Sequence, residues 1–238
     1  MTGQRLERAA AGTTADGVLD LLGLMAYAQL VAFFELTDDA ASAISLADKS
    51  ALAEMAVAEF GHFQLLRQRI IELHADPEAV MQPFVAAVDA FHARTAPSDW
   101  LESLIKAYVG DGIAADFYEA VARLLDAPTQ ALVLEVLSDS GRSAFVIERI
   151  RAAIAADPRV AGRLALWARR LVGEASAQAQ RVAAEREPLA RLLASSPPTE
   201  PESGNGSAQG SQLGDIGRMF ARLADTHAAR MAQLGLSD

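Results

Sequence analysis

Residues 52–73, LAEMAVAEFGHFQLLRQRIIEL, contain the pattern that decides the fold. Apolar side chains recur there every three or four residues, which is the spacing of one face of a helix. Two ionisable residues, Glu59 and His62, occupy this face, which we expect to be buried. Ionisable groups in a core are costly unless they are paired or bind a metal. The complete stripe consists of Leu52, Met55, Glu59, His62, Leu66, Ile70 and Leu73.

The composition favours one all-α domain. The chain has 238 residues, 51% of them hydrophobic and only 6% aromatic, and much of the apolar content is Ala and Leu, which are good helix formers. The chain has no cysteine, which excludes disulfides, thiolate catalysis and thiolate-bound metals.

The charge pattern argues against a broad nucleic-acid interface. The net charge is −10, and no block of basic residues provides the positive surface that phosphates require. A local arginine patch is the one exception that we consider, formed by Arg149, Arg151, Arg163, Arg169 and Arg170.

The N-terminal sequence predicts a cytoplasmic protein without a membrane anchor. Residues 1–8 do not have the pattern of a signal peptide. The longest apolar stretch, Leu21 to Phe34, is too short to cross a bilayer.

Helical periodicity and capping residues predict the order of the elements. Ser45, with Asp48 three residues later, is typical of a capping box, and Ser98 is expected to cap a later helix. Residues 75–97 form a longer connection that contains a short helix. The predicted long helices cover residues 16–39, 45–74, 99–125, 129–156 and 158–187.

These elements divide the chain into four parts. We expect a flexible leader at 1–15, a helical bundle at 16–194, a linker rich in Pro, Gly and Ser at 195–214, and a C-terminal amphipathic helix at 215–238 that packs on the bundle. The apolar face of that last helix consists of Ile216, Met219, Phe220, Leu223, His227 and Met231.

The positions of the helix turns predict which polar residues lie at the same depth. With a turn near residues 40–44, Glu59 and His62 lie at the same depth as residues near 20–28 of the preceding helix. Gln29 is the polar residue closest to that depth. Glu35 is expected nearer the end of the bundle. With a turn near residue 127, Asp139 and Arg142 are level with residues 112–115. Helical spacing turns Asp111 inward, with Asp116 on its flank.

The sequence therefore predicts one polar layer in an apolar bundle. The layer consists of Gln29, Glu59, His62, Asp139, Arg142 and one or both of Asp111 and Asp116. Two interpretations are open. The layer binds metal, or it is a hydrogen-bonded core in which buried acids pair with arginine.

Four segments of the sequence resemble a known family. They are AYAQLVAFFEL from residue 26, LADKSALAEMAVAEFGHFQLL from 46, IKAYVGDGIAADFYEA from 105 and LSDSGRSAFVIERIRAAI from 137. Over residues 16–186 the chain is similar to actinobacterial ferritin-like proteins, distant relatives of the di-iron hydroxylases of tRNA methylthio-isopentenyl-adenosine. The resemblance implies a ferritin-like four-helix bundle with a long crossover between its second and third helices, plus additional C-terminal helices.

The same resemblance implies an activity and a metal. Such hydroxylases use oxygen at two irons, held by one carboxylate from each of two helices and a Glu-x-x-His motif from each of the other two. The implied function is an O₂-dependent oxidoreductase in tRNA modification, with iron or manganese as the metal. The implied metal ligands are Glu59, His62, Asp111, Asp116 and Asp139, with His227 or Glu35 to make up a deficit.

This chain departs from that pattern at two positions. Gln29 stands where the first helix should supply a carboxylate, and Arg142 stands where the second motif should supply a histidine. Arginine stays protonated and cannot bind a cation. The alternative is therefore a metal-free bundle with a relict site, in which Arg142 forms a salt bridge and the protein acts in binding or as a scaffold. We leave the substrate open and consider a second copy of the chain, forming a homodimer, as one partner. The resemblance also implies a nucleic-acid partner, but the negative net charge opposes it.

Overall fold

The computed structural model describes residues 2–138, 142–194 and 226–236. These residues form helices joined by short turns, with no strand among them. The elements are α1 (Thr2–Ser42), α2 (Leu46–Glu72), α3 (Pro77–Met81), the 3₁₀ helix η1 (Gln82–Phe84), α4 (Val85–Arg94), α5 (Trp100–Ala122), α6 (Ala127–Val136), α7 (Arg142–Ala156), α8 (Val160–Glu185) and α9 (Glu187–Ala194). Residues 226–234 form one further helix.

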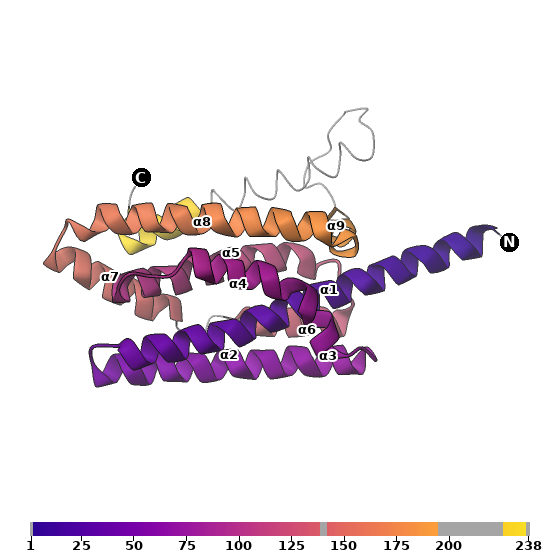
Figure 1. The fold of residues 1–238 in the computed structure, drawn as a ribbon, viewed down its shortest axis with the longest axis horizontal. Coiled ribbons are helices and arrows are strands. Elements are labelled where there is room, and N and C mark those ends of the chain that lie inside the picture. The colour runs from indigo at the N-terminus through magenta and orange to yellow at the C-terminus, as the bar shows by residue number, and fades with distance from the viewer. Residues whose placement is uncertain (1, 139–141, 195–225, 237–238) are drawn as a thin grey trace, which may run out of the picture.

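The helices α1 and α2 form a long hairpin along the lower edge of the molecule (Figure 1). Ser45 caps α2 as predicted: its Oγ accepts a hydrogen bond from the Asp48 N–H at 3.0 Å and donates one to Asp48 Oδ2 at 2.7 Å. Near this turn, Leu36 of α1 packs with Leu52 and Ala56 of α2.

Helix α1 is longer than predicted. It begins at Thr2, whereas the sequence analysis placed a loose leader at residues 1–15. Residues 4–11, QRLERAAA, are all good helix formers, so the helix continues without a break. This first part of α1 extends beyond the other helices in Figure 1.

The length of α1 also bears on the expectation about membrane spans. Its segment Ala15–Ser42 is long and apolar enough to cross a membrane by length and composition, because the helix continues on both sides of the apolar stretch at 21–34. Within this segment, 39% of the most apolar stretch of 18 residues is buried inside the protein. A core helix of a soluble protein passes the same test, so this feature is weak support for a membrane span.

The crossover between the two hairpins is α3, η1 and α4 rather than the single short helix predicted. Asp76 caps α3 by accepting the Glu78 N–H at 3.1 Å. Pro83 lies within η1; since proline has no N–H to donate, a local 3₁₀ turn is favoured there. The crossover brings α4 against α8 and into contact with α1.

The cap of α5 differs from the prediction by one residue. Asp99, not Ser98, is the N-cap, and its Oδ1 accepts the Glu102 N–H at 3.0 Å. Ser98 instead donates its N–H and its hydroxyl to Glu102 Oε2, at 2.8 and 2.6 Å. Asp99 thus caps the helix, and the Glu102 side chain reaches back to Ser98, the residue before the cap, in a variant of the capping box.

The predicted helix at 129–156 is two helices. α6 ends at Val136 and α7 begins at Arg142, with residues 139–141 outside the described part of the chain. The intervening sequence, Ser-Asp-Ser-Gly at 138–141, is poor in helix formers. α6 contacts α2 and α5, whereas α7 contacts α5 and α8. The division thus places Arg142 at the first turn of a helix.

The predicted fifth helix, 158–187, corresponds to α8, and a further short helix, α9, follows it and turns back onto α1. Arg186, between them, donates from Nε to Asp20 Oδ2 of α1 at 3.1 Å. Gly17 allows a close approach, because a Cβ there would lie 2.7 Å from the Pro188 carbonyl oxygen. Together, α8 and α9 cover the upper side of the molecule in Figure 1.

The described C-terminal segment, residues 226–236, packs on α5, α7 and α8. Met231, Leu234 and Leu236 are buried in a cluster that also contains Tyr108 and Leu171. The predicted linker at 195–214 and the predicted face residues Ile216, Met219, Phe220 and Leu223 lie outside the described residues.

Candidate functional site

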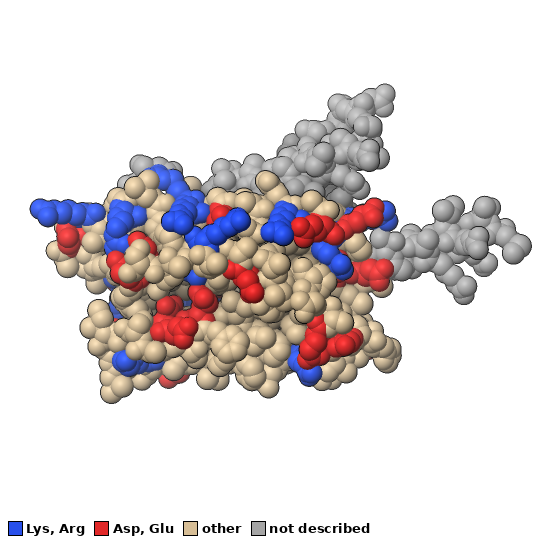
Figure 2. Space-filling model, in the orientation of Figure 1, with Lys and Arg blue, Asp and Glu red and all other residues tan. Residues whose placement is uncertain are grey.

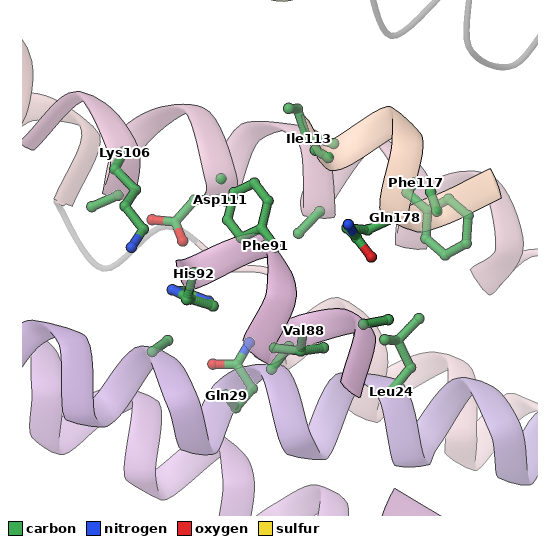
Figure 3. Close-up of a pocket in the computed structure, with 18 of the residues that line it drawn as sticks. Leu24, Gln29, Val88, Phe91, His92, Lys106, Asp111, Ile113, Phe117 and Gln178 are labelled. Carbon is green, nitrogen blue, oxygen red and sulfur yellow. The ribbon is translucent and has the colours of Figure 1, made fainter. Parts of the chain in front are cut away.

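A cavity of about 360 Å³ lies between α1, α4, α5 and α8 (Figure 3). Most of its wall is apolar, and many of the apolar residues are small, which leaves space between the helices. The apolar lining includes Leu24, Ala28, Ala32, Val88, Phe91, Ala107, Gly110, Ile113, Ala114, Phe117, Val172, Ala175, Ala179, Val182, Leu189 and Leu193.

The cavity has a polar end and an apolar end. The α1 residues in its wall run from Leu24 to Asp39, a distance of about 22 Å along a helix. In Figure 3, Lys106 and His92 lie toward one end, and Phe117 and Leu24 toward the other. The arrangement suits an elongated molecule better than a round one.

Arg142 joins three helices at the cavity wall. Its guanidinium forms ion pairs with Glu59 of α2 and Asp111 of α5. Only 11% of the Arg142 side chain and 4% of the Glu59 side chain are exposed, against 45% for Asp111. Burial lowers the pKa of Arg142 to about 10, so the side chain stays charged at neutral pH. The salt bridge of Arg142 that the alternative interpretation of the sequence required is therefore present.

His62 lies beside this ion pair. Its Nδ1 is 3.8 Å from Glu59 Oε2, too far for a hydrogen bond, and it is a buried atom without a hydrogen-bond partner among the described residues. Burial lowers the pKa of His62 below its ordinary value. The imidazole therefore favours the neutral form.

A second charged cluster occupies the polar end of the cavity. Lys106 of α5 donates to Glu35 Oε2 of α1 at 2.5 Å, and His92 Nδ1 of α4 lies 3.2 Å from the same oxygen. These partners outweigh burial and lower the pKa of Glu35 to about 2. Asp39 lies nearby, and burial raises its pKa above the ordinary value. As predicted, Glu35 lies nearer the bundle end than Gln29.

Lys106 and His92 were not among the site residues predicted from the sequence. One signal was available for Lys106, which interrupts the apolar run Leu104, Ile105 and Val109; a charge in such a run needs a buried partner. No comparable signal pointed to His92, because its position depends on how the crossover helix α4 packs.

A family model for the ferritin-like domain of actinomycetes matches residues 13–196. The chain belongs to this family. The match covers the bundle from α1 through α9 and agrees with the all-helical ferritin-like fold that the sequence predicted. Comparison with curated proteins gives no match.

The described residues of this ferritin-like domain do not fit a pair of metal ions. Among residues 2–138, 142–194 and 226–236, no group of three or more His, Asp or Glu side chains is arranged to hold a metal. Arg142 places a fixed positive charge on the carboxylates of Glu59 and Asp111, where a cation would have to bind. Asp139, another predicted ligand, lies outside the described residues.

Asp116, also a predicted ligand, takes part in a different contact. Its carboxylate accepts two hydrogen bonds from Arg230 of the C-terminal segment, one of them at 2.6 Å to Nη1. Gly112 makes room for this contact, because a Cβ there would lie 2.8 Å from the Arg230 side chain. The arrangement separates Asp116 from the ion pair of Arg142 and ties residues 226–236 to α5.

The arginines considered as a nucleic-acid patch are engaged within the domain. Arg149 Nε donates to Asp48 Oδ1 at 2.8 Å, and Arg163 pairs with Asp99 at 2.7 Å. Arg151 donates to the Gln233 carbonyl at 2.8 Å, and Arg170 to the Arg94 carbonyl at 2.6 Å. Basic side chains do gather along the upper edge of Figure 2, but acidic ones lie among them.

Proposed function

We propose that this ferritin-like domain is a metal-independent binding protein that holds a small, largely apolar molecule in the cavity between α1, α4, α5 and α8. The observation that carries the proposal is the position of Arg142, whose guanidinium is paired with Glu59 and Asp111 at the wall of that cavity.

The ion pair supplies the compensation that a buried carboxylate requires. Glu59 is almost fully buried, and a buried charge is stable only with a partner or a metal. Because the guanidinium provides that partner, the carboxylate needs no bound cation. A divalent cation at the same place would be repelled by Arg142, since the two positive charges would lie within a few ångströms of each other.

The cavity has the size and lining of a ligand site. Sites for small molecules have volumes of about 300–1,000 Å³ and walls that are mainly apolar with a few polar groups. The cavity of about 360 Å³ fits this description. Protein interiors otherwise contain few voids larger than a water molecule, so a space of this size supports a bound molecule.

A cavity-filling variant tests the binding proposal. Gly110 lines the cavity, and a Cβ added there meets nothing within 4 Å, so the phenyl ring of Gly110→Phe has space to enter the cavity. Gly173→Phe is the matched control, because Gly173 is exposed on α8 and its Cβ position is also open.

The measurement is the fluorescence gain of N-phenyl-1-naphthylamine, a neutral apolar probe. We expect the wild-type protein and Gly173→Phe to bind it and Gly110→Phe to bind at least tenfold more weakly. Lack of binding by the wild type, or equal binding by Gly110→Phe, would contradict the proposal. Circular dichroism melts confirm that both variants are folded.

The alternative is an O₂-dependent oxidoreductase, a tRNA hydroxylase by resemblance, with iron or manganese as cofactor. Its support is the position of Glu59 and His62 on consecutive turns beside Asp111. It requires Arg142 to leave both carboxylates. Elemental analysis of protein grown with added iron or manganese distinguishes the two: we expect far less than stoichiometric metal in the wild type and a gain in Arg142→His. Stoichiometric metal in the wild type would overturn our proposal.

A further inference from the structure

Four buried polar atoms of the cavity wall have no hydrogen-bond partner among the described residues: His92 Nδ1, Arg142 Nε and two amide oxygens. The amide oxygens, Gln29 Oε1 and Gln178 Oε1, are buried and accept no hydrogen bond from the described residues. Resting on the proposed function, we infer that the molecule bound in this cavity is an elongated amphiphile that carries no negative charge and donates hydrogen bonds, as a long-chain alcohol or amine does.

The orientation of Gln178 follows from its neighbour on α8. Its Nε2 donates to Glu174 Oε1 at 2.7 Å. A carboxylate accepts hydrogen bonds but does not donate them, so the atom facing Glu174 is the nitrogen, and the carbonyl oxygen is left for the interior. Only 7% of Gln178 is exposed, and the residue lies between Ile113 and Phe117 in the view of Figure 3.

Gln29 provides the second acceptor, from the opposite wall. It projects from α1 toward His92 in Figure 3. A buried acceptor without a donor carries a desolvation cost. A ligand hydroxyl or amine removes this cost on binding, whereas a methyl ether or a carboxylate does not, because neither has a hydrogen to donate at neutral pH.

The charges of the wall disfavour an anion. The lining contains four carboxylates, on Glu35, Asp39, Glu59 and Asp111, and two cations, on Lys106 and Arg142. Both cations are already paired, Lys106 with Glu35 and Arg142 with Glu59 and Asp111. A fatty-acid carboxylate would therefore meet more negative than positive charge, and it would have to compete with the carboxylates that already pair with both cations.

Four matched dodecyl compounds test this inference by displacing N-phenyl-1-naphthylamine at submicellar concentrations near neutral pH. They share one tail and differ in the head: dodecanol, dodecylamine, dodecanoate and dodecyl methyl ether. We expect dodecanol and dodecylamine to bind, dodecanoate to bind at least tenfold more weakly, and the ether about fivefold more weakly than the alcohol, the value of one hydrogen bond.

The double variant Gln29→Leu/Gln178→Leu then assigns the acceptors. It should bind dodecanol and the ether equally well, while the control Gln180→Leu, an exposed glutamine on the same helix, should keep the preference for the alcohol. A preference for the alcohol that survives in the double variant would overturn the assignment.

The outcomes separate this inference from the proposed function. If the probe and all four compounds fail to bind the wild-type protein, the proposed function itself is wrong. If dodecanoate binds as well as dodecanol, or the ether binds as well as the alcohol, the cavity is a binding site but the ligand class inferred here is wrong. Both results come from the wild-type protein and do not depend on whether a variant folds.

Discussion

The guanidinium of Arg142, in the first turn of α7, is paired with the buried carboxylate of Glu59 in α2. The same guanidinium also pairs with the more exposed Asp111 of α5. One side chain therefore joins three helices that are far apart in the sequence. Its positive charge lies beside the carboxylates of Glu59 and Asp111, which the resemblance had implied as metal ligands.

Removal of Arg142 should destabilise the protein by leaving Glu59 without a partner. We expect Arg142→Met to lower the free energy of unfolding by about 3 kcal/mol at neutral pH, as measured by urea unfolding, because an uncompensated charge stays in the core. The double variant Glu59→Gln/Arg142→Met should recover most of that loss. A single variant as stable as the wild type would show that the ion pair contributes nothing to stability.

The contact between Asp116 and Arg230 should hold the C-terminal segment on the bundle. Both side chains are about one-fifth exposed, so we expect Arg230→Met to lower the free energy of unfolding by about 1–2 kcal/mol. The control is Arg181→Met, which removes an exposed ion pair with Glu185 and should cost less than about 0.5 kcal/mol. Equal effects of the two variants in urea unfolding would contradict the prediction.

The turn positions predicted that Arg142 is level with Asp111 or Asp116, and Glu59 of the other hairpin joined them only through the expectation of a single polar layer. Helical spacing gives the inward direction of each side chain, and the positions of two turns give its depth. The direction and the depth of a side chain both depend on nearby residues, so these predictions hold although the predicted fourth helix is divided into α6 and α7. Asp116 was assigned to the same layer, but its partner Arg230 comes from a segment more than a hundred residues away.

The cluster of Glu35, Lys106 and His92 could not be predicted from helical spacing and turn positions. Glu35 and Lys106 lie on α1 and α5, which are not consecutive, and His92 lies on the crossover helix α4. Turn positions relate only helices that follow each other in a hairpin. The packing of α4 and α8 around the cavity depends on contacts between distant segments, and spacing within the sequence does not encode them.

Glycine substitutions should have opposite effects at two positions. A Cβ at Gly23 of α1 would lie 2.4 Å from the Val80 carbonyl oxygen of α3, so Gly23→Ala should force the two helices apart and cost about 1–3 kcal/mol. Gly173 is exposed on α8 with open space around it, so Gly173→Ala should add up to about 1 kcal/mol through helix propensity. Thermal unfolding measures both. Stabilisation by Gly23→Ala would show that α3 does not approach α1 this closely.

The ion pairs of Glu35 should contribute stability that is lost in acid. Lys106 and His92 lower the pKa of this carboxyl group from 4.5 to about 2 in the folded protein. Above pH 4.5 the group is ionised in both states, and its contribution to stability is complete. As the pH falls from 4.5 toward 2, the unfolded chain binds a proton that the folded protein does not, so this contribution is lost.

Glu35→Gln lacks the titrating group. We therefore expect this variant to be less stable than the wild type at neutral pH, with the difference in urea unfolding decreasing as the pH falls through this range. Lys106→Met removes one of the two partners, so Glu35 should then lose its contribution at a higher pH. A difference between Glu35→Gln and the wild type that stays constant from neutral pH to pH 3 would show that the Glu35 pKa is not lowered.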